Sequence, residues 1–406
     1  MGRKGHKLGS QVSLSLEKTA SMIVPEAFGL EQTLSQHLDT LSLQDQIAGP
    51  SKQKSGRVHV QHTTTNPSFT GTAVRDSLHR LSVLEQETHG AEAEAEADDA
   101  RPSPAPQDNL LEIVSTPDRG LAVFATRKVK AGTLLLAERP LVRLQKHEED
   151  DPAAIEREFS RLGRADQRIF LKLFDAQKSR MTRVVSIYYS NCYNLDDHVA
   201  DGGRGGSAVG PFASRINHGC VPNVQFCYDE KTDEMRFRAV RDIPRGKELC
   251  SNYDKAVFEV RTKRRRKQQI HYGFVCRCEA CEPKTGFWAR SDERRRAMYE
   301  ALRVARACEK ECSSKRCPAP PTVVVDRAIE ALVRLEELFL KEGLVGVPLA
   351  NTRKSLAKWA ERKYDHAQAV KWKTKELEVC KVSFGSDALR TKGVEDQLIE
   401  LSLKVT

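Results

Sequence analysis

The sequence has no cysteine before Cys192, no apolar run of about 18 residues, and only two aromatic residues, Phe28 and Phe69, before residue 109. The missing run argues against a membrane-spanning helix, and the opening MGRKGHKLGSQVSL lacks the apolar core of a secretory signal. A segment so poor in aromatic residues cannot bury enough apolar surface to offset its ordering entropy. We therefore expect residues 1–108 to form a disordered tail.

The net charge does not identify a partner, but the positions of the cysteines indicate their chemical state. The 66 basic and 56 acidic residues leave a net charge of +10, which favours acidic partners weakly and identifies none. Seven of the 11 cysteines lie between Cys192 and Cys281. Because no export signal is evident, this clustering indicates metal ligands or reduced thiols instead of disulfides.

The pattern of the remaining chain predicts an α+β fold. Short β-rich runs and tight turns come first, a helical insertion interrupts them, and amphipathic helices follow. The predicted strands cover 111–115, 121–125, part of 133–144, 224–229 and 235–240, and the predicted helices cover 152–177, 326–342, 352–363, 366–382 and 388–403. The segment WAERKYDHAQAVKWKTKELEV resembles one tetratricopeptide helix pair, but no second copy is evident, so a plain helical bundle is an equal alternative.

Three thiols lie within six residues, at Cys276, Cys278 and Cys281. Three thiolates so close together repel one another unless a soft cation neutralises them, and tetrahedral Zn²⁺ is the usual solution. Zinc needs a fourth ligand, for which Cys220 and His218 are the upstream candidates. Reduced structural cysteines are the alternative. The spacing of Cys308, Cys312 and Cys317 is not diagnostic of a second metal site.

Four motifs occur in an order that resembles SET-domain proteins over about residues 110–283: STPDRGLAVFA, RINHGCVPN, ELCSNYD and YGFVCRCEAC. The resemblance is strongest to the SMYD-like branch, without its MYND finger. It implies a SET-type β-clip core of short curved sheets with a helical insertion, a zinc-bound post-SET segment and an all-α C-terminal region. The implied domains are residues 109–284 and 285–406.

The resemblance also implies a function and a set of site residues. The function is S-adenosylmethionine-dependent methylation of a lysine side chain in a protein; a catalytically inactive SET scaffold for protein interactions is the alternative. The family usually has Ser where this chain has Gly219. The implied residues are Arg119, Gly120 and Leu121 at the methionine part of the cofactor, Asn217 and His218 at its amino and adenine ends, Phe274 on its adenine ring, Tyr253 as catalytic tyrosine, Tyr272 as a wall of the lysine channel, and Cys220 with Cys276, Cys278 and Cys281 as zinc ligands.

The chemistry agrees with these residue types. A lysine with a pKa of about 10.4 must lose its proton before it can accept a methyl group, and a buried aromatic channel beside a sulfonium lowers that pKa. A tyrosine hydroxyl can then orient the amine. We expect a protein substrate, with histones among the candidates, in the nucleus, the cytoplasm or both. Direct nucleic-acid binding is not expected, because no aromatic residues interleave the basic run at 261–267.

Overall fold

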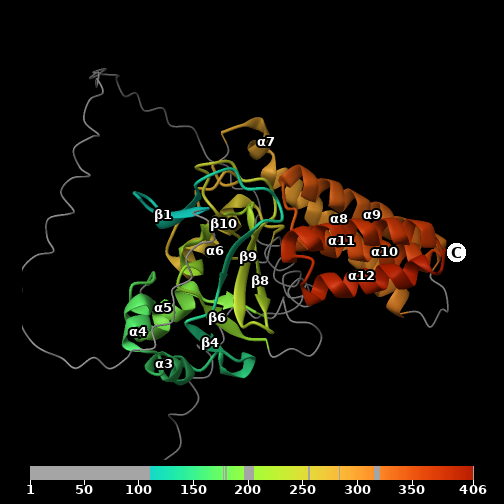
Figure 1. Ribbon diagram of the computed structural model, residues 1–406. Helices are drawn as coiled ribbons and strands as arrows, with labels where there is room; N and C mark the ends of the chain where they lie inside the picture. The colour runs from blue at the N-terminus through green and yellow to red at the C-terminus, as the bar shows by residue number, and fades with distance from the viewer. Residues whose placement is uncertain are drawn as a thin grey trace, which may run out of the picture. The chain divides into compact units, whose positions relative to one another are not determined.

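The computed structural model describes residues 110–176, 178, 181–195, 205–254, 257–282, 284–314 and 321–405 (Figure 1). The expected tail at 1–108 lies outside these ranges. The first half of the described chain consists of short strands interrupted by helices, and the second half is helical. This is the α+β arrangement that the sequence predicts.

Within the described residues, the strands form four small sheets instead of one large one. Two are pairs, β1 with β2 and β10 with β7, and two have three strands, in the orders β3-β9-β8 and β4-β6-β5. Side chains on β9 alternate between the two faces of its sheet, so Met235, Phe237 and Ala239 are buried and the other residues of the strand are not. The strands are β1 (Leu111–Thr116), β2 (Gly120–Ala125), β3 (Leu134–Glu138), β4 (Val142–Leu144), β5 (Tyr193–Asn194), β6 (Ser207–Val209), β7 (Asn217–His218), β8 (Val224–Asp229), β9 (Glu234–Ala239) and β10 (Cys250–Ser251).

The expected helical insertion contains more than one helix. Its first part divides into α3 (Pro152–Ser160) and α4 (Arg164–Leu171), and α5 (Arg183–Asn191) follows. Asp151 begins α3 by accepting a hydrogen bond of 2.9 Å from the Ala153 amide. Gly163 is extended and separates the two helices, so the single span 152–177 was too simple.

The C-terminal helices pack in chain order, each of α8 to α12 against the next (Figure 1). On α9, the buried residues Val325, Ala328, Leu332, Leu335 and Phe339 recur at helical spacing and form one apolar face. The helices are α6 (Arg261–Tyr272), α7 (Gly286–Ala289), α8 (Ser291–Ser314), α9 (Thr322–Glu342), α10 (Val347–Arg362), α11 (His366–Phe384) and α12 (Leu389–Ser402). The tetratricopeptide-like nature of α10 and α11 and the domain boundaries remain predictions.

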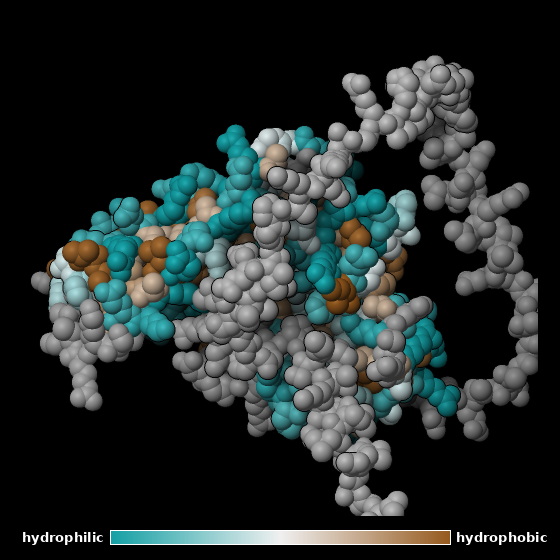
Figure 2. Space-filling model, turned by 180° about the vertical axis from the view of Figure 1, so that it is seen from behind, coloured by the Kyte–Doolittle hydropathy of each residue, from teal (hydrophilic) through white to brown (hydrophobic). Residues whose placement is uncertain are grey.

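On the face shown in Figure 2, small hydrophobic patches are separated by hydrophilic surface. None of the described helices is both long enough and apolar enough to cross a membrane.

Candidate active site and metal centre

A parallel pairing of β7 with β10 brings two distant motifs together. Asn217 lies opposite Cys250, and His218 lies opposite Ser251. Asn223 reinforces the pairing, because its side chain accepts a hydrogen bond of 2.7 Å from the Cys250 amide and donates one of 2.8 Å to the Glu248 carbonyl. The RINHGCVPN and ELCSNYD motifs therefore form one structural unit.

The close approach of β7 and β10 requires glycine at position 219. Its amide donates a hydrogen bond of 2.8 Å to the Ser251 carbonyl. A Cβ atom at Gly219 would lie 2.8 Å from the Cβ of Cys250, a distance at which backbone must shift. The serine usual in the family is therefore incompatible with Cys250 at this separation.

His218 and Tyr253 are joined directly. The Tyr253 amide donates a hydrogen bond of 3.1 Å to His218 Nδ1, and their ring centroids are 5.2 Å apart. Burial lowers the pKa of His218 to about 4, so the ring is neutral near pH 7. Because Nδ1 accepts, the proton is on Nε2, which lies 3.3 Å from the sulfur of Cys220. We assign His218 as a hydrogen-bond donor to that sulfur.

Tyr253, Tyr272 and Phe274 gather around the same histidine. The Tyr253 and Tyr272 ring centroids are 5.1 Å apart, and Phe274 lies 6.1 Å from the His218 ring. The Tyr253 hydroxyl donates a hydrogen bond of 2.9 Å to the carbonyl of Ile216. Burial raises the pKa of both tyrosines well above the usual range. Their hydroxyls therefore stay protonated and do not act as bases.

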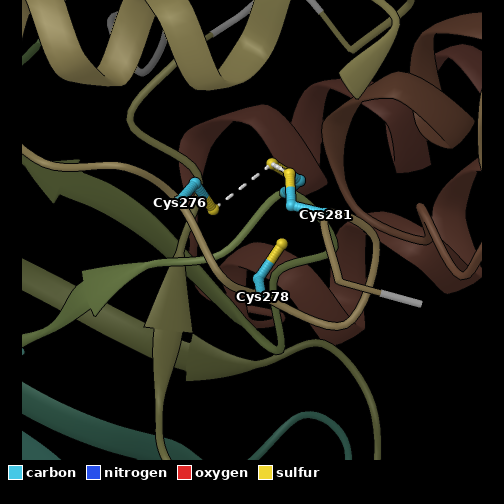
Figure 3. Close-up of side chains that lie close together, drawn as sticks. Cys276, Cys278 and Cys281 are labelled. Carbon is cyan, nitrogen blue, oxygen red and sulfur yellow. Dashed lines mark hydrogen bonds between the residues drawn. The ribbon is translucent and has the colours of Figure 1, made fainter. Parts of the chain in front are cut away.

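The four expected cysteine ligands converge. All four sulfurs lie within 4.8 Å of one another, with Cys220 3.5 Å from Cys281 and 3.9 Å from Cys276. A tetrahedral zinc with Zn–S bonds of about 2.3 Å requires sulfurs about 3.8 Å apart. Figure 3 shows the sulfurs of Cys276, Cys278 and Cys281 directed toward a common point. The donor set and its spacing fit zinc, and the structure selects Cys220, not His218, for the fourth position.

The second cysteine group does not form a metal site within the described residues. Cys308 is buried on α8 and its sulfur accepts a hydrogen bond of 3.2 Å from Arg327 Nε. Cys317 lies outside the described ranges. The described cysteines are all free thiols, in agreement with the expectation of reduced thiols or metal ligands.

Three of the expected cofactor residues, Arg119, Leu121 and Asn217, meet next to β7. Arg119 donates hydrogen bonds of 2.6 Å to the His218 carbonyl and to Glu248, and Asn217 donates one of 2.9 Å to Glu248 and one of 3.3 Å to the Leu121 carbonyl. Gly120 has a φ of +67°, and a Cβ there would meet nothing within 4 Å. The hydrogen bonds bring Arg119, Leu121 and Asn217 together around Glu248.

Comparison with known proteins agrees with this geometry. The model of the SET domain family matches residues 120–254. This part of the chain is a SET domain. Its relatives include histone-lysine N-methyltransferase set5 of Schizosaccharomyces pombe, 31% identical over 172 residues, which are 42% of this chain and 50% of the relative. The chain thus spans about half the length of that relative.

Two further similarities are weaker. N-lysine methyltransferase SMYD2-B of Danio rerio is 25% identical over 189 residues, 41% of this chain and 42% of the relative. The solved SET domain of LSMT bound to lysine and AdoHcy is 11% identical, with a TM-score of 0.26 over 74% of this chain and 89% of that one. Such a TM-score is too low to support an argument about the site.

Two buried arginines lie next to the thiol cluster. Arg264 lies 3.6 Å from the sulfur of Cys281 and donates a hydrogen bond of 2.9 Å to the Ala280 carbonyl. Arg295 donates one of 2.9 Å to the Cys220 carbonyl. Arg264 therefore places a positive charge beside the thiols, whereas the Arg295 charge is paired with Glu342 at 3.0 Å. The sequence pattern did not reveal these two arginines. Arg264 is one of six basic residues within the seven-residue segment 261–267, and Arg295 lies on α8, outside the motifs.

Proposed function

We propose that this chain is an S-adenosylmethionine-dependent protein-lysine N-methyltransferase, with Tyr253 as its catalytic residue. The observation that carries the proposal is the position of Tyr253 between the Asn217–His218 strand and the Tyr272 ring. This position lies between the group of residues that fits a polar cofactor and an aromatic wall that fits a lysine side chain.

S-adenosylmethionine, when bound, supplies the methyl group and a positive sulfonium. The rings of Tyr253 and Tyr272 exclude water from the incoming lysine, so its ammonium loses hydration and its pKa falls. The Tyr253 hydroxyl donates a hydrogen bond to the Ile216 carbonyl, which leaves the lone pairs of its oxygen available as acceptors. Those lone pairs accept an N–H of the neutral amine and direct the nitrogen lone pair along the line of attack.

The thiol cluster has a structural role in this proposal. Zinc held by Cys276, Cys278 and Cys281 would tie the post-SET segment to Cys220, two residues from His218. Tyr272 and Phe274 precede the first of these ligands by only four and two residues. Metal binding thereby contributes to the order of the lysine channel and does not enter the chemical step.

The relatives indicate which class of substrate to test. Several relatives are named histone-lysine N-methyltransferases. We therefore propose histones as the first substrates to test and the nucleus as one location. The alternative of an inactive scaffold predicts no methyl transfer, whether or not the cofactor binds.

Calorimetry with S-adenosylmethionine tests the cofactor half of the proposal. We expect binding to the full chain, and affinity at least about tenfold weaker for Asn217→Ala and Phe274→Ala, since each removes a group that faces the cofactor. The matched control is Phe287→Ala, an exposed aromatic residue on α7. Absence of binding to the wild-type chain, or equal weakening by the control, would contradict the proposed site.

A further inference from the structure

The segment between α4 and α5 brings a lysine of this chain onto the Tyr272 ring. Lys178 Nζ lies 5.9 Å from the ring centroid and donates a hydrogen bond of 2.6 Å to the His271 carbonyl. The Lys178 amide donates a hydrogen bond of 3.0 Å to the hydroxyl of Ser186 on α5. Ser186 in turn donates one of 2.5 Å to Asp175. Contacts at both its backbone and its amine hold Lys178 at this place.

The Lys178 amine has different partners from the amine of Lys267. Within the described ranges its amine forms no ion pair with a carboxylate, whereas Lys267 on α6 pairs with both Asp254 at 3.2 Å and Glu259 at 2.9 Å. Burial lowers the pKa of Lys178. A buried amine with a lowered pKa, and without a carboxylate counterion among the described residues, loses its proton more readily than an exposed lysine.

We propose that Lys178 is a methyl acceptor of this chain's own active site. The inference rests on the proposed function, because it requires the methyl donor and the aromatic channel described above. Tyr272 contacts Lys178 through its ring and lies 5.1 Å from Tyr253, the proposed catalytic residue. The lysine side chain, which has four rotatable carbon bonds, is thereby placed next to the channel wall that a substrate lysine would use.

The step balances without any further reactant. The Lys178 ammonium releases a proton to water, and its nitrogen lone pair forms a bond to the methyl carbon as the bond from that carbon to sulfur breaks. The electron pair of the broken bond remains on sulfur, and S-adenosylhomocysteine leaves. The acceptor nitrogen is alkylated, and no oxidant or reductant is required.

A second lysine–aromatic contact in the chain provides a control for the Lys178–Tyr272 contact. Lys375, on α11, lies 4.3 Å from the ring centroid of Trp372. That pair is within the C-terminal helices and is not part of the cofactor or lysine groups. If an aromatic contact alone made a lysine reactive, Lys375 would be modified as well. Our proposal predicts modification of Lys178 and not of Lys375.

The test uses the full chain, S-adenosylmethionine with a deuterated methyl group, and peptide mass spectrometry after cleavage at acidic residues. We expect labelled Lys178 and unlabelled Lys375. Label at Lys178 should fall at least about tenfold in Tyr253→Phe, and its first-order rate should not change when the protein is diluted. A Lys178→Arg variant should lose this label and still bind the cofactor in calorimetry.

Core histones in the same reaction separate the two proposals. Labelled histone with unlabelled Lys178 would overturn the self-methylation and support the proposed function. Equal label in Tyr253→Phe would show a reaction that the site does not catalyse, and a rate proportional to protein concentration would show transfer between molecules; either overturns the inference. Failure of calorimetric cofactor binding would overturn the proposed function and this inference with it.

Discussion

The guanidinium of Arg295 donates a hydrogen bond of 2.9 Å to the carbonyl oxygen of Cys220. This contact connects α8 to the residue that supplies the fourth thiol of the metal site. Arg295 also donates to the Val257 carbonyl, just after the ELCSNYD motif, and to Glu342 at 3.0 Å, on α9. Both charged side chains are buried. The C-terminal helices therefore support the SET domain at Cys220, the fourth proposed zinc ligand, and just after the motif that contains the proposed catalytic tyrosine.

Removal of the Glu342 charge tests this support. Glu342→Gln leaves a buried arginine without its counterion, so we expect a loss of about 3–5 kcal/mol in the free energy of unfolding and faster zinc release to a chelator. The control is Glu337→Gln on the same helix, whose exposed pair with Arg334 predicts a loss below about 1 kcal/mol. Equal effects of the two variants in urea unfolding would show that the buried pair has no special role.

The Gly219–Cys250 contact predicts a coupled effect. Gly219→Ala places a methyl group against the Cys250 Cβ, so we expect a loss of about 1–3 kcal/mol in stability and reduced methyl transfer as β7 moves from β10. In a Cys250→Gly background the space is available, and the same change should cost at least about 1 kcal/mol less. A double-mutant cycle in urea measures the difference. An additive pair would refute the steric explanation.

Glu138 predicts a pH dependence of stability. Its buried carboxylate accepts hydrogen bonds from the amides of Phe212 and Ala213, just before the RINHGCVPN motif, and burial raises its pKa to about 7 from 4.5. The folded chain thus binds more protons than the unfolded chain between these values. The Glu138 contribution to stability therefore falls by about 3 kcal/mol as the pH rises from about 4.5 to 7.

The comparison with Glu138→Gln isolates this contribution. Across that pH range the stability of the wild type relative to the variant should decrease, because the amide does not titrate. Exposed Glu112 provides the control, since Glu112→Gln should leave the slope of the wild type unchanged. A wild-type-minus-variant difference that is flat with pH would contradict the raised pKa.

Metal analysis tests the thiol cluster. We expect about one zinc per purified chain and its loss in Cys276→Ser, because three remaining thiolates hold the ion less tightly. Cys276→Ser should also increase hydrogen exchange at Tyr272 and Phe274. The control is Cys308→Ser, a buried thiol outside the cluster, which should retain the zinc. Zinc-free active protein would disprove the site.

The sequence predicted those parts of the site that depend on local motifs. The spacing of Cys276, Cys278 and Cys281 predicted a metal site, with reduced cysteines as the alternative, and the structure brings Cys220 to them as the family resemblance implied. Arg295, Glu342 and Lys178 were missed. Their roles arise from contacts over long sequence separations, so periodicity and spacing carry no signal for them. Glu248 was missed although it lies in the ELCSNYD motif, because its partner Arg119 precedes it by 129 residues.

The central claim is that Tyr253 orients a lysine for methyl transfer, and methyl transfer by Tyr253→Phe tests it most directly. The measurement is the initial rate of labelled methyl incorporation into core histones and into the chain itself, with cofactor affinity measured alongside. We predict a rate about 10²-fold below wild type, with cofactor binding unchanged within about twofold and the fold retained. Wild-type transfer by Tyr253→Phe, or no lysine methylation by a wild-type chain that binds the cofactor, would contradict the account.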